Sequence, residues 1–214
     1  MDKEKIDYWN KVANSGEIYD CLDTELLRYQ RELVDKLRIY NLTPENDLGY
    51  QEREKILKEI CGQYNEGLCI LPPVHANFGL NHVFFGKNVF VNFNSTFVDD
   101  ANIYIGDNTL IGPDVNIATA IHPISPILRR YGLQYNKSVR IGENVWIGAN
   151  ATILPGVTIG DNSIIGGGAV VTHDIPSNVI AVGNPARILR EITEDDYLYF
   201  DKKPIPKEIL ETYK

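Results

Sequence analysis

The stretch IGENVWIGANATILPGVTIGDNSIIGGGAV, residues 141–170, consists of six-residue units that each begin with isoleucine. A six-residue period fits neither a helix, which repeats every 3.6 residues, nor a pleated strand, which alternates every two. The period is typical of a β-solenoid, in which the first and the small fifth residue of each unit point inward and Gly or Asn occupies the turns. The residues that head such units are Phe85, Val91, Phe97, Ile105, Ile111, Ile117, Ile141, Ile147, Ile153, Ile159, Ile165 and Val171.

The six-residue register fails between Ile117 and Ile141, where the chain reads HPISPILRRYGLQYNKSVR over residues 122–140. Prolines, paired arginines and aromatic residues occur together in this stretch. A solenoid has no structural need for such an insertion, and long excursions from a rigid scaffold commonly carry function. We therefore expect a protruding functional loop.

The first 60 residues differ in character, because they hold only two of the 17 glycines and many charged residues. Apolar residues between Leu22 and Leu37 follow a helical period, with Asp23 or Thr24 as the cap, and a second helix is expected over 51–60. Such a charged helical pair is usually a docked cap, and it can also supply residues to a neighbouring site.

Length and charge narrow the functional classes. The chain has 214 residues, which suggests one domain or one domain with an appendage, and a net charge of −8. This acidity argues against nonspecific binding of nucleic acid or anionic membrane. No apolar run reaches the roughly 20 residues of a membrane span, and no secretory signal is visible, so the cytoplasm is expected. Three cysteines without a CxxC motif are interpreted as reduced thiols.

Several motifs together identify a family. They are the HP at the start of the loop, VNFN at 91–94, NVWIG at 144–148, LPGVTIGDN at 154–162 and GNPAR at 183–187. With these motifs the chain resembles the maltose, galactoside and nodulation-factor O-acetyltransferases of the hexapeptide-repeat superfamily. The resemblance implies a mostly β protein, a left-handed parallel β-helix that forms a homotrimer and binds acetyl-CoA between adjacent subunits. The expected organisation is a helical cap at 1–60, the β-helix at 61–190 with its loop at 122–139, and a C-terminal tail at 191–214.

Acetyl transfer to a hydroxyl requires a base for the alcohol proton and donors for the oxyanion. A neutral imidazole suits the first task, since its unperturbed pKa lies near working pH. The family motif maps the general base onto His122, which implies direct transfer in a ternary complex. The resemblance also implies a set of acceptor-binding residues. Two alternatives stay open. Asn92 could instead be a turn asparagine at a solenoid corner, a role that Asn94 could equally fill, and Asp100 could be a solvated carboxylate at a corner. The acceptor set is Asp20, Asn77, Phe90, Asn92 and Asp100.

The coenzyme site needs small residues along a groove and cations for the phosphates. Arginine suits phosphate geometry. For Arg187 and Arg190 the alternative to phosphate binding is a salt bridge in the tail. No metal is expected. The coenzyme set implied by the resemblance is Gln134, Trp146, Ala149, Gly167, Thr172, His173, Arg187 and Arg190.

Three positions depart from the family pattern. Gln134 stands where many relatives have a Glu thought to orient the catalytic His, although an amide can still hydrogen-bond the ring. His173 replaces a Lys expected near coenzyme phosphate, and Asn77 replaces Ser or Asp in the acceptor pocket. These departures leave the named sugar open.

Three other functions compete with sugar acetylation. One is acetyl transfer to a non-sugar acceptor such as serine or an antibiotic. Another is a zinc enzyme of the same scaffold, in which His75, His82 and His122 would meet across a trimer interface. The third is a non-catalytic solenoid module.

Overall fold

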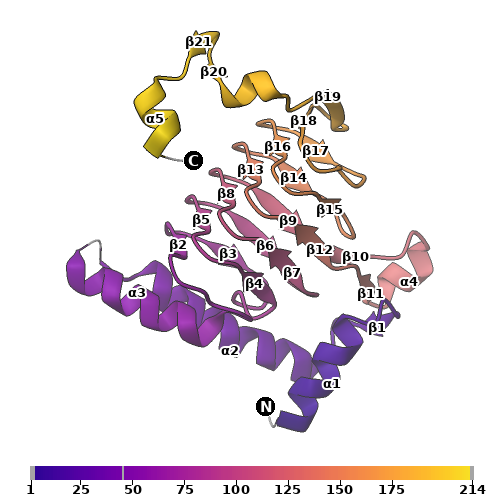
Figure 1. The fold of residues 1–214 in the computed structure, drawn as a ribbon. Coiled ribbons are helices and arrows are strands. Elements are labelled where there is room, and N and C mark those ends of the chain that lie inside the picture. Colours follow the sequence, from indigo (N-terminus) through magenta and orange to yellow (C-terminus); the bar gives the residue numbers. More distant parts are fainter. Residues whose placement is uncertain (1–2, 45, 213–214) are drawn as a thin grey trace.

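A computed structural model describes residues 3–44 and 46–212, so the outermost residues of the predicted cap and tail lie outside the described residues. It contains a parallel β-solenoid with a helical cap at one end and a loop that projects from its side (Figure 1). The predicted β-helix of hexapeptide repeats is therefore confirmed. No helix within the described ranges combines the length and apolar character needed to cross a membrane.

Three parallel sheets form the sides of the solenoid, and short turns at three corners connect them. Sheet I contains β4 (Val83–Phe85), β7 (Ile103–Ile105), β12 (Val139–Ile141) and β15 (Thr158–Ile159). Sheet II contains β2 (Cys69–Ile70), β5 (Phe90–Val91), β8 (Leu110–Ile111), β13 (Trp146–Ile147), β16 (Ile164–Ile165), β18 (Val179–Val182) and the antiparallel β19 (Arg187–Glu191). Sheet III contains β3 (His75–Ala76), β6 (Thr96–Val98), β9 (Asn116–Ala118), β14 (Thr152–Ile153) and β17 (Val170–Val171).

The residues that head the hexapeptides stack directly above one another inside the solenoid. Ile141 pairs with Ile159, which lies 18 residues later, so one coil takes three hexapeptides. All twelve of these residues are buried, and the small fifth residues are buried with them in most units. The unit at Ile117 is an exception: its fifth residue, Ile121, is only half-buried, because the chain has already left the coil to enter the loop.

The extra residues leave the solenoid at one corner, between sheets III and I, which we call the III/I corner. Ile105 follows Phe97 by eight residues instead of the six of a regular hexapeptide, and the whole loop is inserted after Ile117. The turns at the other corners are tight, and asparagines there adopt left-handed backbone conformations, as Asn144 and Asn162 do at φ 52° and 59°. Their side chains also hydrogen-bond to each other at 2.9 Å. The III/I corner is therefore the place where the fold accepts additional residues.

The helical cap closes the lower end of the solenoid. It consists of α1 (Lys3–Ala13), α2 (Thr24–Asn41) and α3 (Asp47–Ile60). The carboxylate of Asp23 accepts hydrogen bonds from the first turn of α2, so the expected cap residue is correct. Leu22 was expected on the apolar face of this helix, but it precedes the helix and is exposed. Leu37 and Leu57 join the solenoid core.

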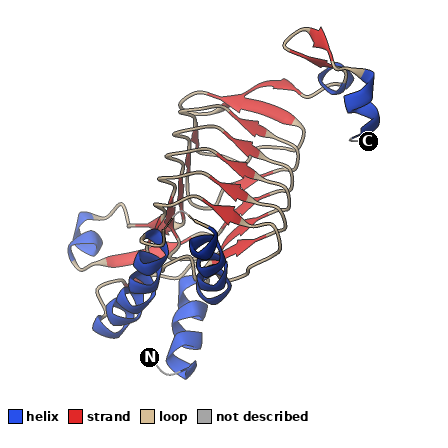
Figure 2. Cartoon of the chain, turned by 90° about the vertical axis from the view of Figure 1, so that its left-hand side faces the viewer, coloured by secondary structure: helices blue, strands red, loops and turns tan. Residues whose placement is uncertain are grey.

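The loop and the tail have their own short elements. The loop contains β10 (Ala120–Ile121), α4 (Pro126–Arg130) and β11 (Leu133–Asn136), and β1 (Tyr19–Asp20) of the cap pairs with β11. The tail contains η1 (Glu194–Tyr197), β20 (Tyr199–Phe200), β21 (Lys203–Pro204) and α5 (Lys207–Thr212). The loop and the tail project from opposite sides of the molecule (Figures 1 and 2).

The inward stack predicts a large difference between two adjacent residues of β14. Ile153 is fully buried, and Thr152 on the same strand points outward. Ile153→Ala is expected to lower the free energy of unfolding by about 2–5 kcal/mol, because it leaves a cavity between two coils. Thr152→Ala, measured beside it by denaturant unfolding at equal protein concentration, is expected to lower it by less than about 1 kcal/mol. Equal effects would contradict the stacking register.

Candidate active site

His122 lies in the loop, directly after β10 and before Pro123, and its side chain is exposed. Its Nδ1 atom is 3.1 Å from the carbonyl oxygen of Leu133 on β11. A carbonyl oxygen only accepts hydrogen bonds, so this contact assigns the ring proton to Nδ1 and leaves the lone pair of Nε2 free. An imidazole in this tautomer can take a proton from a bound hydroxyl.

Asp100 forms the centre of a polar cluster at the same III/I corner. The side chain is nearly buried, with 7% of the residue exposed. One carboxylate oxygen accepts a hydrogen bond from Asn77 Nδ2 at 2.8 Å, and the other accepts one from Gln134 Nε2 at 2.9 Å. Each oxygen keeps a second lone-pair direction, so the carboxylate can still accept a hydrogen bond from a ligand hydroxyl. The structure thus brings together two predicted acceptor residues, Asn77 and Asp100.

Asp20 reaches this corner through the β1–β11 pairing, in which it lies opposite Leu133. Its side chain is exposed, and one carboxylate oxygen accepts a hydrogen bond from the backbone N–H of Leu22 at 2.8 Å. The cap therefore supplies a carboxylate beside the strand whose carbonyl orients His122. This placement is consistent with an acceptor role for Asp20.

Gln134 does not take the position that the sequence suggested. Its amide nitrogen, with two N–H donors, lies within hydrogen-bond distance of the Tyr19 hydroxyl at 2.7 Å, of Asp100 at 2.9 Å and of Asn136 at 3.0 Å. No hydrogen bond joins it to His122 within the described chain. Its side chain is buried and hydrogen-bonds Asp100. The carbonyl of Leu133 holds the imidazole instead. An amide suits this position because a glutamate would bring a second negative charge against Asp100.

A second layer of buried polar groups lies beneath Asp100. Sequence reasoning gave Asp99 no role in it and named His82 only in the competing zinc hypothesis. Asp99 is fully buried, with Oδ1 accepting from the Phe78 N–H at 2.7 Å and Oδ2 without a hydrogen-bond partner among the described residues. Burial, followed by the charge of Asp100, raises the pKa of Asp99 to about 7. The adjacent acidic pair in FVDDAN is the sequence signal that could have pointed to Asp99.

His82 belongs to the same layer. Its Nδ1 lies 2.6 Å from the carbonyl oxygen of Asp99, and its Nε2 lies 2.9 Å from Asn10 Oδ1. Burial lowers the pKa of His82. Both ring nitrogens are thus engaged, and the described residues contain no group of three His, Cys, Asp or Glu side chains placed to hold a metal ion.

Four other predicted residues lie away from the III/I corner. Three are at the corner between sheets II and III, and one is on sheet II. Asn92 follows β5 at the corner between sheets II and III, and its side chain accepts from the Phe93 N–H at 2.9 Å. Ala149 and Gly167 lie at the same corner on higher coils, where the backbones approach closely: a Cβ on Gly167 would meet the Ala149 oxygen at 3.2 Å. Phe90 lies in β5 on sheet II. One chain therefore holds His122 and Asn92 at two different corners.

Sheet II carries an outward-facing row of apolar side chains. Phe90, Leu110 and Trp146 occupy the same register position on three successive strands, and 53% of Trp146 is exposed. Such a row on the outside of a solenoid is suited to contact with a ligand or another protein surface.

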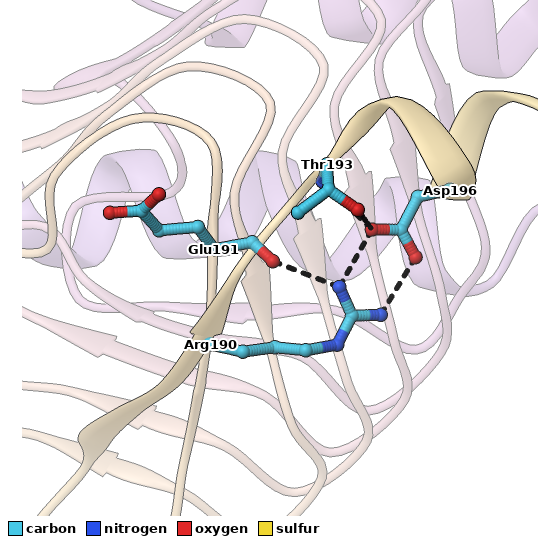
Figure 3. A network of polar contacts seen from close by, with 4 residues as sticks. All are labelled: Arg190, Glu191, Thr193 and Asp196. Atoms are coloured by element: carbon cyan, nitrogen blue, oxygen red, sulfur yellow. Dashed lines mark hydrogen bonds and ion pairs between the residues drawn. The ribbon is translucent and has the colours of Figure 1, made fainter.

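The remaining predicted coenzyme residues lie on the last coils. The hydroxyl of Thr172 contacts His173 Nδ1 at 2.8 Å, and Arg187 donates to the carbonyl of Ala186. Both nitrogens of the Arg190 fork pair with the carboxylate of Asp196 at 2.6 and 2.7 Å, as Figure 3 shows. For Arg190 the structure thus contains the alternative contact, the salt bridge in the tail.

Comparison with known proteins matches both the hexapeptide repeats and the helical cap of this chain to one family. Residues 138–173 match the family model for the bacterial transferase hexapeptide (six repeats), and residues 14–65 match the maltose acetyltransferase hexapeptide capping motif. The galactoside O-acetyltransferase of Lactococcus lactis is 42% identical over 92% of this chain and 94% of its own length. The chain belongs to the hexapeptide-repeat O-acetyltransferases.

Solved structures of this family resemble the chain over nearly its whole length. A galactoside acetyltransferase in complex with coenzyme A aligns with a TM-score of 0.86 at 35% identity, covering 96% of this chain and 99% of that one. A maltose O-acetyltransferase from Clostridium difficile 630 aligns with a TM-score of 0.82 at 40% identity, covering 87% and 98%. In this hexapeptide acetyltransferase the match to the capping motif, residues 14–65, includes Asp20 and the helices α2 and α3 of the cap.

The buried carboxyl of Asp99 predicts a pH-dependent stability. Because its pKa in the folded protein is raised, it contributes stability below about pH 4 that is lost as the pH rises to about 7. Asp99→Asn keeps the Oδ1 acceptor and removes the titration. The free energy of unfolding of the wild type minus that of the variant is therefore expected to fall by on the order of 2 kcal/mol between pH 5 and pH 8.

Denaturant unfolding at fixed protein concentration measures this difference. The control is Asp7→Asn on the exposed surface of α1, for which the difference is expected to stay constant. A constant difference for Asp99→Asn as well would show that Asp99 is ionised throughout.

Proposed function

We propose that this protein transfers an acetyl group from acetyl-CoA directly to a hydroxyl of a sugar or glycoside, with His122 as the general base. The observation that carries the proposal is the exposed His122 with Nδ1 bonded to the Leu133 carbonyl, beside the Asp100 cluster, in a chain of this family. The bound coenzyme A in a related structure supports the choice of co-substrate.

In the proposed reaction, the acceptor hydroxyl gives its proton to Nε2 of His122 while its oxygen attacks the thioester carbonyl. The carbon–sulfur bond then breaks, and the protonated imidazole returns the proton to the departing thiolate of coenzyme A. Asp100 accepts a hydrogen bond from another acceptor hydroxyl, with Asn77 and Gln134 holding its carboxylate in place. A ring rich in hydroxyl groups suits this acidic and amide-lined corner.

We also propose that the working enzyme is a homotrimer with each active site between two copies. His122 and Asn92 lie at different corners of a rigid solenoid, so one chain cannot bring both to one substrate. A second copy supplies Asn92 and Phe90 to the His122 loop, and the exposed row Phe90, Leu110 and Trp146 provides an apolar surface for this contact. Coenzyme A lies in the same seam, with its phosphates toward Arg187 and His173 on the upper coils.

Replacement of the base tests the chemistry. His122→Ala is expected to lower acceptor-dependent release of the coenzyme thiol by at least about 100-fold, the usual size of a general-base contribution. The assay uses acetyl-CoA with a panel of glucose, maltose, galactosides, glucosamine and nucleotide sugars. The matched control is His75→Ala, which removes another exposed histidine on the outer face of sheet III and is expected to keep wild-type rates. Equal rates for His122→Ala and wild type would remove His122 as the base.

A further inference from the structure

We propose that the C-terminal tail, residues 191–212, packs against the protruding loop of a second copy of this chain. The inference rests on the homo-oligomer proposed above and adds a contact that neither the site nor the family motifs require. It follows from the surface of the tail, the surface of the loop and their positions in the fold.

The tail has ordered elements but no core of its own. None of its residues is buried, and its strands are two residues long and its helix six. A two-stranded hairpin and a six-residue helix are marginal in water without support from a larger surface. Large apolar side chains nevertheless lie on its outside, and 58% of Phe200 is exposed. The other exposed apolar residues of the tail are Tyr197, Leu198, Tyr199 and Ile209.

The loop has the complementary surface. Residues 122–139 contain two arginines and one lysine and no acidic residue, whereas residues 191–201, EITEDDYLYFD, contain five acidic residues and no basic one. Exposed apolar side chains accompany the positive charges of the loop: Ile124, of which 94% is exposed, together with Ile127 and Tyr131. Opposite charges around apolar contacts favour association of these two segments.

Within one chain the two segments cannot meet. The tail leaves the last coil on one side, and the loop projects from the other side at the foot of the solenoid in both views (Figures 1 and 2). The loop that contacts the tail must therefore come from another copy.

The ion pair between Arg190 and Asp196 sets the direction in which the tail leaves. Arg190 lies in β19, at the end of sheet II, and Asp196 is held in turn by the N–H of Thr193 at 2.9 Å (Figure 3). The tail consequently starts from the sheet that carries the row Phe90, Leu110 and Trp146. A partner loop that docks on this row is then contacted by the sheet on one side and by the tail on the other, so the two contacts form one continuous interface.

A photo-crosslink tests this arrangement. Phe200 is replaced by p-benzoylphenylalanine, which keeps an aromatic side chain at an exposed position, and the full-length protein is prepared in heavy- and light-isotope forms and mixed. After illumination, we expect a product of doubled mass on a denaturing gel, with mixed-isotope peptides that join position 200 to residues 122–139. The matched control places the same probe at Ile39, an exposed residue of α2, and is expected to give no such peptide.

A crosslink from position 200 to its own chain, to another region of the partner, or to nothing would overturn the inference. A second measurement uses a chain truncated after Ile192, for which the concentration of half-dissociation is expected to rise at least about tenfold. Unchanged dissociation would also count against the contact. Acetyl transfer is assayed on the same samples: an active enzyme without the crosslink refutes only the tail contact, and a crosslinked but inactive enzyme refutes only the proposed function.

Discussion

The stacking of the inward-facing aliphatic residues is the constraint on which the rest of the structure depends. Ile141 lies above Ile105 and beneath Ile159, and an extra residue within one of these strands would move the residues that follow it in that strand to the opposite face. Additional residues can therefore leave the coil only at a corner. In this chain they leave at the III/I corner, first as three residues between Ala76 and Phe85, then as two between Phe97 and Ile105, and finally as the whole loop. The position of His122 is a consequence of that packing.

The same rigidity divides the candidate site. The III/I corner offers a base and a braced carboxylate, and the opposite edge of sheet III offers Asn92 and close-packed backbone. A solenoid of stacked coils has no hinge that closes this separation. Association with a second copy is the simplest way to bring the two halves to one substrate. The apolar row on sheet II and the uncovered tail support the homotrimer proposed above.

Sequence reasoning reached the fold because a six-residue period directly reports which side chains point inward. His122, Asn77 and Asp100 were predicted as site residues through family motifs, and the structure places these three at one corner. It failed where a side chain had a choice of partners. Gln134 was expected beside His122, but it braces Asp100, because the antiparallel pairing of β10 with β11 turns it inward and leaves the Leu133 carbonyl for the imidazole.

Three further outcomes depended on packing that no local pattern reveals. Asp99 is fully buried, and nothing in the letters FVDDAN distinguishes it from Asp100, which meets the acceptor-side cluster. Leu22 fits the helical period, yet the cap at Asp23 starts the helix after it. Arg190 pairs with a tail residue six positions later, which requires the 3₁₀ turn that follows it.

A complementation experiment tests the division of the site between copies most directly. Chains carrying His122→Ala and chains carrying Asn92→Ala are unfolded together and refolded as a mixture, and acetyl transfer is compared with each variant refolded alone. Some interfaces in the mixture then combine an intact His122 from one chain with an intact Asn92 from the other. Random assembly of equal amounts is predicted to restore about a quarter of wild-type activity. Activity no greater than that of the separate variants, in mixed assemblies verified by mass, would contradict a site shared between copies.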